Sequence, residues 1–223
     1  MKEITLCLYG IEELKSEAQE TAFEKNRYIN VEFNDWYDLQ YLDFDGICES
    51  IGVEIPTDGI VFSGFHSQGD GSAFYSIIDL ERFLDGIINE PWKVFAHDVE
   101  LDFTPCPCDR RVLALLRKGS IGYRHYTDIP ARGYWINFKS EYDYSGSFAN
   151  IENELSKLDD WMTKELECLN KHLYETLENE YEYQISNEAI RETFISNDTQ
   201  FTGDGNKADH LLDLIEQNME VTE

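Results

Sequence analysis

The last third of the chain carries the clearest hydrophobic pattern. Apolar positions recur there every three or four residues, and they are Ile151, Leu155, Leu158, Met162, Leu166, Leu169, Leu173, Leu177 and Tyr181. At roughly 3.6 residues per turn, this spacing predicts one long amphipathic helix of about eight or nine turns. Two shorter helices are predicted after it, over residues 188–195 and 207–219.

The first two thirds of the chain mix strand and helix patterns. Strands are predicted at 2–9, 59–65, 73–78, 99–103, 121–126 and 134–142, and helices at 12–28, 35–51, 79–89 and 110–118. The turn sequence Gly69-Asp70-Gly71 between two apolar runs is typical of a β-hairpin.

These elements predict an α+β fold: a mostly antiparallel sheet with flanking helices, followed by a helical C-terminal third. We expect residues 1–147 to form the sheet domain that carries the hairpin turn. Residues 148–223 are expected to form a helical part packed on that domain.

Charge sets the first limit on function. The chain has 223 residues with 45 Asp and Glu against 18 Lys and Arg, a formal net charge of −27. Because 42% of the residues are hydrophobic and 13% aromatic, the chain has the apolar content of a folded protein, and the charge is expected on its outside. Such a surface repels phosphate and attracts basic proteins, so we expect no direct binding to nucleic acid.

Other features narrow the class further. No apolar run approaches the roughly 20 residues of a membrane helix, and the first residues lack a secretory signal pattern. Five cysteines with irregular spacing fit reduced thiols in a cytoplasm. We expect no cofactor and no metal, because Cys106 and Cys108 lack a second pair, the histidines show no HExxH spacing, and no Walker or Rossmann motif is present.

The hairpin turn is the densest polar cluster beside apolar strands. Ser67, Gln68 and Asp70 are candidate ligand-binding residues, and Asp70 is a candidate base. The alternative is that Asp70 and the serines bond their own backbone, as these residue types commonly do in turns.

A second candidate is the segment Tyr123-Arg124-His125-Tyr126. On a strand, Tyr123 and His125 share one face, so His125 is a candidate acid–base partner of Asp70. The alternative is a hydrogen-bonded histidine in a sheet.

The third candidate is an acidic face on the long helix. Its members are Glu165, Glu167, Glu175, Glu178, Glu180 and Glu182. Rows of carboxylates imitate the charge of DNA and release counterions when a basic protein binds them. The alternative is a solvated charged face that serves only solubility.

The segment from Phe62 to Phe74, FSGFHSQGDGSAF, resembles the FSGFxSQGDGAxF signature of a family of uncharacterised bacteriophage proteins. Residues 14–22, 123–126, 177–186 and 195–205 are similar to further segments of that family, although the histidine at 125 comes one place early. The resemblance covers nearly the whole chain. It assigns the signature to Ser63, Gly64, Phe65, Ser67, Gln68, Gly69, Asp70 and Gly71, with His66 at a variable place, and implies a phage-encoded protein, sometimes labelled an antitoxin, that acts in the host cytoplasm.

Three functional hypotheses follow. The first is a phage anti-defence protein or antitoxin that neutralises a host toxin, nuclease or DNA-modifying enzyme with a basic surface, in part by acidic DNA mimicry. The second is an enzyme or a binder of a small, nucleotide-like ligand at Ser67, Gln68, Asp70 and His125. The third is an assembly module that forms a homodimer through the long helix.

Overall fold

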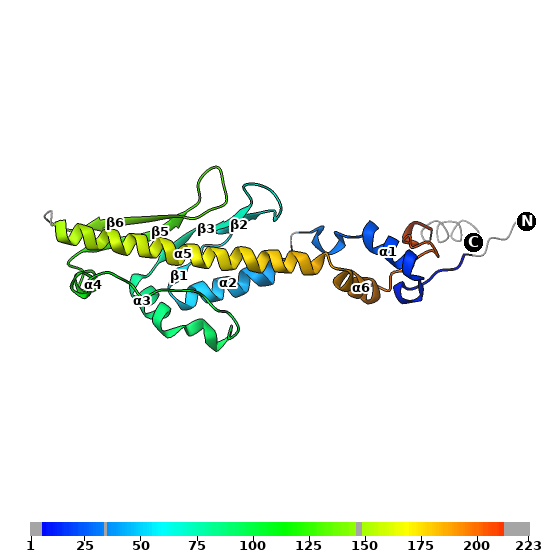
Figure 1. Cartoon of the computed structure of the whole chain (residues 1–223), viewed down its shortest axis with the longest axis horizontal. Helices are drawn as coiled ribbons and strands as arrows, with labels where there is room; N and C mark the ends of the chain where they lie inside the picture. The colour runs from blue at the N-terminus through cyan, green and yellow to red at the C-terminus, as the bar shows by residue number, and fades with distance from the viewer. Residues whose placement is uncertain (1–5, 34, 146–148, 212–223) are drawn as a thin grey trace, which may run out of the picture. The chain divides into compact units, whose positions relative to one another are not determined.

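The computed structural model describes residues 6–33, 35–145 and 149–211 (Figure 1). It divides the chain into two compact units, a larger one spanning Tyr37–Glu178 and a smaller one made of Met1–Trp36 and Asn179–Glu223. The expected boundary at residue 147 lies inside the larger unit, because helix α5 (Ala149–Gln184) supplies much of that unit's core.

Two antiparallel sheets form in the larger unit, as the predicted α+β class requires. The first has the order β1-β4-β5-β6, with β1 at Val53–Glu54, β4 at Ser76–Ile78, β5 at Gly122–Asp128 and β6 at Asn137–Asp143. The second pairs β2 (Ile60–Ser63) with β3 (Gly71–Phe74), which confirms the predicted hairpin. The apolar run at 73–78 therefore supplies a strand to each sheet rather than one strand.

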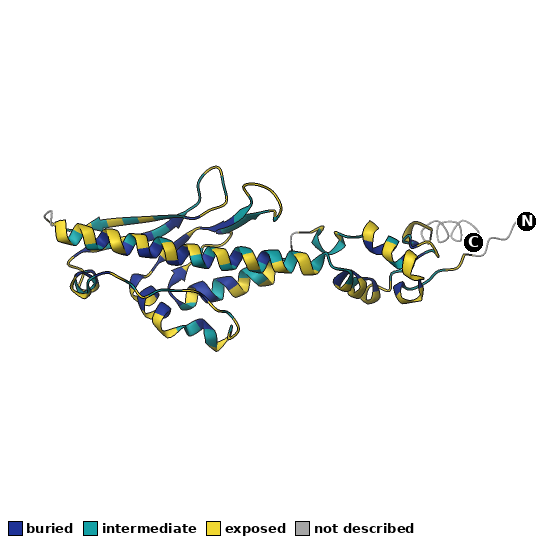
Figure 2. Ribbon diagram, viewed as in Figure 1, coloured by how far each residue is buried: buried dark blue, intermediate teal, exposed yellow. Residues whose placement is uncertain are grey.

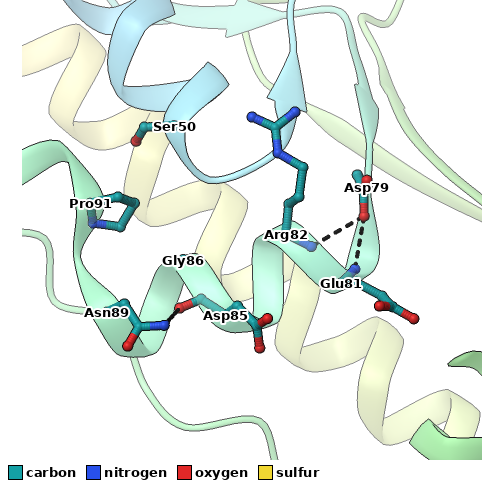
Figure 3. Close-up of a pocket in the computed structure, with 8 residues that line it drawn as sticks. All are labelled: Ser50, Asp79, Glu81, Arg82, Asp85, Gly86, Asn89 and Pro91. Carbon is teal, nitrogen blue, oxygen red and sulfur yellow. Dashed lines mark hydrogen bonds between the residues drawn. The ribbon is translucent and has the colours of Figure 1, made fainter.

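Helices of the larger unit agree with the predicted segments. They are α2 (Asp38–Ser50), α3 (Leu80–Asn89), α4 (Arg110–Arg117) and most of α5. The 3-10 helix η3 (Pro91–Val94) was not predicted. Asp79 caps α3, because its carboxylate accepts hydrogen bonds from the amides of Glu81 at 3.0 Å and Arg82 at 3.1 Å (Figure 3). A cap of this kind contributes about 1 kcal/mol to helix stability.

The prediction of a strand at residues 99–103 is wrong. Leu101 is buried and Phe103 packs against Trp92 at 5.6 Å between ring centroids, so the alternation does place apolar side chains inward. The backbone, however, bonds locally and to a side chain instead of a neighbouring strand. The amides of Val99 and Phe103 donate to carbonyl oxygens only two or three residues earlier, and the indole of Trp92 donates to the Val99 carbonyl oxygen at 3.2 Å.

Helix α5 provides the spine of the larger unit's core and confirms the long helix predicted from the pattern. Seven of its apolar residues at the predicted spacing are buried: Leu155, Leu158, Met162, Leu166, Leu169, Leu173 and Leu177. Figure 2 shows this buried stripe alternating with exposed residues along the helix. Burying each such side chain contributes about 1.5–3 kcal/mol, so this stripe is a major source of stability.

The smaller unit has its own apolar cluster. Its elements are η1 (Ile11–Glu13), α1 (Ser16–Lys25), η2 (Ile29–Val31), the end of α5 and α6 (Asn187–Ser196). Phe194 stacks on Phe23 at 6.3 Å and meets Phe201 edge-on at 4.9 Å, which joins the start and end of the chain in one core.

Two predicted elements of the smaller unit reach beyond the described residues. Of the predicted strand at 2–9, residues 2–5 lie outside them, and Tyr9 forms an isolated antiparallel bridge with Phe201. Residues 212–219 of the predicted final helix also lie outside them. None of the helices in the described ranges has the length and apolar character needed to cross a membrane.

Candidate functional site

The carboxylate of Asp70 is bonded within its own turn. It accepts hydrogen bonds from the amides of His66 at 2.9 Å and Ser67 at 2.6 Å, and from the hydroxyl of Ser63 at 3.3 Å. Gly64 has a φ of 27°, and a Cβ there would lie 2.8 Å from Asp70 Oδ2, so only glycine fits beside this carboxylate. These contacts are those of a brace that holds the turn in shape, and they leave Ser67 exposed.

The turn is also fixed from outside. A Cβ on Gly71 would lie 2.5 Å from the carbonyl oxygen of Tyr134, and the hydroxyl of Tyr174 on α5 donates to the Gly64 carbonyl oxygen at 3.3 Å. Gln68, at the tip, is exposed. The identities of three motif residues, Gly64, Asp70 and Gly71, are therefore explained by the structure of the turn.

His125 lies in a buried polar network between β5, β6 and α5. Its Nε2 is 3.1 Å from the hydroxyl of Tyr142, which donates to Asp159 at 2.6 Å, and Ser140 donates to the same carboxylate at 2.8 Å. Because the Tyr142 hydrogen is used on Asp159, Nε2 of His125 carries the hydrogen that is donated to Tyr142. The Nδ1 atom is buried and has no hydrogen-bond partner within the described ranges.

Burial sets the charge state of this network. It lowers the pKa of His125 from 6.5 to about 4, so the ring is neutral at pH 7, and it raises the pKa of Asp159. Tyr123 stacks on His125 at 5.1 Å between ring centroids, as expected for residues that share a strand face. No hydrogen bond joins His125 to Asp70 in the part of the chain that the structure describes.

The expected acidic face on α5 needs one correction and one refinement. Glu165 does not lie on this face, because it is fully buried. Its carboxylate accepts a hydrogen bond from the Thr104 amide at 3.2 Å and another from the Thr104 hydroxyl. The other predicted members divide into exposed and half-buried ones: Glu167, Glu175 and Glu182 are exposed, and Glu178 and Glu180 are half-buried.

Lysines interrupt these carboxylates. Lys164 and Lys171 lie three and four residues from Glu167 on the same side of the helix, and Lys171 pairs with Glu175 at 3.5 Å. The exposed side of α5 in the larger unit is therefore of mixed charge rather than an uninterrupted row of carboxylates.

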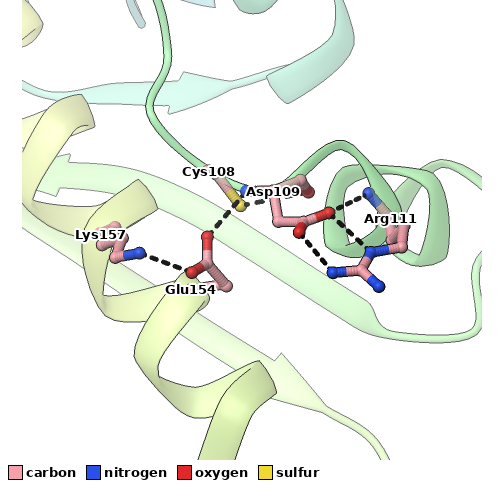
Figure 4. A network of polar contacts seen from close by, with 5 residues as sticks. All are labelled: Cys108, Asp109, Arg111, Glu154 and Lys157. Carbon is pink, nitrogen blue, oxygen red and sulfur yellow. Dashed lines mark hydrogen bonds and ion pairs between the residues drawn. The ribbon is translucent and has the colours of Figure 1, made fainter.

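The segment around Cys108 is a structural junction (Figure 4). Asp109 caps α4 through the Arg111 amide at 2.8 Å and pairs with the Arg111 guanidinium, which lowers its pKa to about 2. The Asp109 amide donates to Glu154 of α5 at 2.7 Å, and Glu154 also pairs with Lys157 at 2.6 Å. Burial raises the pKa of Cys108 to about 12, which disfavours the thiolate needed for metal binding or nucleophilic attack.

The described ranges contain no group of three or more His, Cys, Asp or Glu side chains placed to hold a metal ion.

A pocket of about 300 Å³ lies between α2, residues 95–99 and α5. Its lining residues are Gln40, Asp43, Phe44, Ile47, Phe95, Ala96, His97, Asp98, Val99, His172 and Thr176. The Oε1 atom of Gln40 is buried and lacks a hydrogen-bond partner among the described residues, and burial lowers the pKa of His172. The sequence pattern did not point to this pocket, because its walls come from three segments far apart in the chain.

The protein thus has an α+β fold. Its hairpin turn, the network around His125 and the surface pocket all lie in the larger unit, Tyr37–Glu178. Residues 36–187 match the family model of a domain of unknown function, DUF8835, and the chain belongs to this family. The match includes both sheets and all of α5. No curated protein and no solved structure matched the chain.

Proposed function

We propose that this protein is a phage-encoded inhibitor that binds a basic host toxin, or a nucleic-acid-acting defence enzyme, in the host cytoplasm and neutralises it. The observation that carries the proposal is the placement of the acidic residues. Among the described residues, Glu165 is the one acidic side chain that is buried, so the other carboxylates of this part of the chain are exposed or half-buried.

Self-repulsion of this surface supports a role in binding. A large net charge destabilises a compact fold, and binding a basic partner offsets that repulsion while it releases counterions. The resemblance of residues 62–74 to a phage signature supports the phage origin and the antitoxin role.

The smaller unit offers the surface best suited to imitate DNA. It carries 19 acidic and 6 basic residues, whereas the larger unit carries 26 and 12. On α1, Glu17, Glu20 and Glu24 are exposed at a spacing that places them along one side of the helix. No lysine stands within this row, in contrast to the mixed face of α5.

The test begins with a pull-down from host cells and mass spectrometry of the retained proteins. The affinity for the retained target is then measured from low to high salt, with and without duplex DNA as competitor. We expect binding to weaken steeply with salt and DNA to compete, because both act on the same basic surface. Binding that is unaffected by salt and DNA refutes the mimicry.

Two charge-matched variants locate the contact. Replacing Glu17, Glu20 and Glu24 with Gln is expected to weaken target binding at least about tenfold, which corresponds to about 1.4 kcal/mol. The control replaces Glu167 and Glu175 with Gln and Asp160 with Asn, all of them exposed on α5 within the larger unit. It removes the same charge and is expected to change affinity less than about threefold. Equal losses in the two variants would show that net charge, rather than the α1 row, carries the binding.

The alternative proposal is an enzyme or small-ligand site at Ser67, Gln68, Asp70 and His125. The unpartnered Nδ1 of His125 is the observation that favours it. The appropriate variant is Asp70→Asn, which keeps an acceptor oxygen for the turn but removes the carboxylate base. Unchanged inhibition of the host target by this variant refutes the alternative.

A further inference from the structure

The pocket between α2, residues 95–99 and α5 is rich in hydrogen-bond acceptors. Its volume of about 300 Å³ is at the lower end for ligand pockets, which suits one side chain or a small molecule. Asp43 of α2 and Asp98 supply carboxylates, and Gln40 supplies a buried amide oxygen. This lining favours a cation that donates hydrogen bonds.

Gln40 provides a hydrogen-bond acceptor that lacks a donor among the described residues. Its Oε1 atom is buried, and a buried acceptor that stays unpaired is unfavourable. An N–H group in the pocket pairs with this oxygen when the Gln40 side chain rotates to turn Oε1 towards the pocket. His172 does not oppose a cation, because burial lowers its pKa and keeps the ring neutral at pH 7.

Large apolar side chains are exposed next to pocket-lining residues of α2, and Phe95, itself a lining residue, is exposed as well. Leu39 is 70% exposed, Leu42 is 66% exposed and Phe95 is 56% exposed. A Cβ on Gly46 would lie 3.7 Å from the ring of Phe95, so this ring lies over α2 one turn beyond Leu42. Leucines and an aromatic ring grouped beside a polar pocket are typical of a protein-binding surface.

We infer that this surface binds a basic amphipathic helix of a partner protein, with one arginine of that helix inserted in the pocket. The guanidinium would donate to Gln40 and pair with Asp43, and the apolar side of the helix would cover Leu39, Leu42 and Phe95. An arginine suits the pocket because its planar fork supplies several N–H donors at once. This inference goes beyond the proposed function, since it assigns a shape-specific contact within the larger unit, separate from charge attraction at α1.

The test measures binding of a fluorescently labelled amphipathic Leu/Arg helix peptide by anisotropy, using the full chain. The control peptide carries citrulline in place of each arginine, which keeps the shape and removes the charge. We expect the arginine peptide to bind at least about tenfold more tightly, the equivalent of about 1.4 kcal/mol. Equal binding of the two peptides overturns the inference.

Protein variants place the contact in the pocket. Asp43→Asn changes an exposed side chain and is expected to weaken binding of the arginine peptide about fivefold to tenfold. The control, Asp160→Asn on the exposed side of α5, removes the same charge and is expected to change the affinity less than about twofold. Gln40→Leu is expected to weaken binding similarly, with its folding checked by urea denaturation. Equal effects of Asp43→Asn and Asp160→Asn overturn the inference.

The two proposals fail separately. If the host target binds in a salt-dependent manner but the peptide does not distinguish Asp43→Asn from Asp160→Asn, the pocket inference is wrong and the inhibitor proposal stands. If the peptide responds as expected but no salt-dependent target exists, the inhibitor proposal is wrong and the pocket remains a site for a basic helix.

Discussion

Buried His125 makes a quantitative prediction about stability in acid. Its pKa is lowered from 6.5 to about 4, chiefly by burial, so between these two pH values the unfolded chain binds a proton that the folded chain does not. The free energy of unfolding therefore falls as the pH falls from about 6.5 towards 4. At about 1.36 kcal/mol per pKa unit, the whole effect is about 3 kcal/mol, and about 2 kcal/mol of it is lost between pH 7 and pH 5.

The perturbation is His125→Phe, which fills a similar space and cannot titrate. Urea denaturation at pH 7 and pH 5, followed by tryptophan fluorescence, gives the loss of stability in each protein; pH 5 stays above the sequence pI of about 4.3. We expect the wild-type loss to exceed the variant loss by about 2 kcal/mol, because the other titrating groups contribute alike to both proteins and cancel. Replacing the exposed His97 with Gln serves as the matched control and is expected to retain the wild-type loss.

Tyr142 and Asp159 are titratable groups in the same network as His125. Variants at these positions distinguish the effect of burial on the pKa of His125 from the effect of its hydrogen bond. The raised pKa of Asp159 acts in the opposite direction, since a folded state that takes up a proton more readily gains stability in acid. Tyr142→Phe removes the link between His125 and Asp159 but leaves the histidine buried, so most of the wild-type pH dependence should remain. A His125 ring that titrates near 6.5 by NMR in the folded protein would refute the reasoning.

Three further predictions concern stability, each measured by urea denaturation. Asp70→Ala removes three hydrogen bonds of the turn and should lower the free energy of unfolding by about 1–2 kcal/mol, more than Asp70→Asn does; a stable alanine variant would show that the turn does not depend on the carboxylate. Glu165→Leu leaves the amide and hydroxyl of Thr104 unpaired and should lower the free energy of unfolding by about 2–3 kcal/mol. Glu165→Gln keeps one acceptor and should lower it less. Equal losses in the two variants would contradict the assigned hydrogen bonds. Gly71→Ala places a Cβ 2.5 Å from a carbonyl oxygen and should lower the free energy of unfolding by about 1–3 kcal/mol. Gly122→Ala, whose Cβ would lie 3.5 Å from its nearest neighbours, should lower it less. The reverse order would contradict the packing at the turn.

Local pattern was sufficient for the elements whose residues interact mainly with their sequence neighbours. The three- and four-residue spacing of leucines predicted α5 because a helix repeats every 3.6 residues whatever it packs against. The hairpin followed from two glycines around Asp70 between apolar runs, since the turn and its register depend on that short segment. The capping role of Asp79 likewise needs contacts of only two and three residues.

Tertiary contacts decided what the same residue types do. Glu165 has the sequence appearance of an exposed helix carboxylate, yet it is buried because Thr104, 61 residues earlier in the chain, brings two donors to it. Residues 99–103 do alternate, but none of the strands in the described part of the chain pairs with them. Leu39 and Leu42 fit a buried helix face by their residue type, and the structure leaves them at the surface.

The sequence by itself therefore determined the class of fold, the long helix, the hairpin and the acidity of the surface, because these depend on periodicity, turn chemistry and composition. Only the tertiary structure decided which carboxylates face solvent, that His125 is buried beside Tyr142 rather than bonded to Asp70, and that Gln40, Asp98 and His172 line one pocket. These features join segments far apart in the chain, and no local pattern encodes the distance between them.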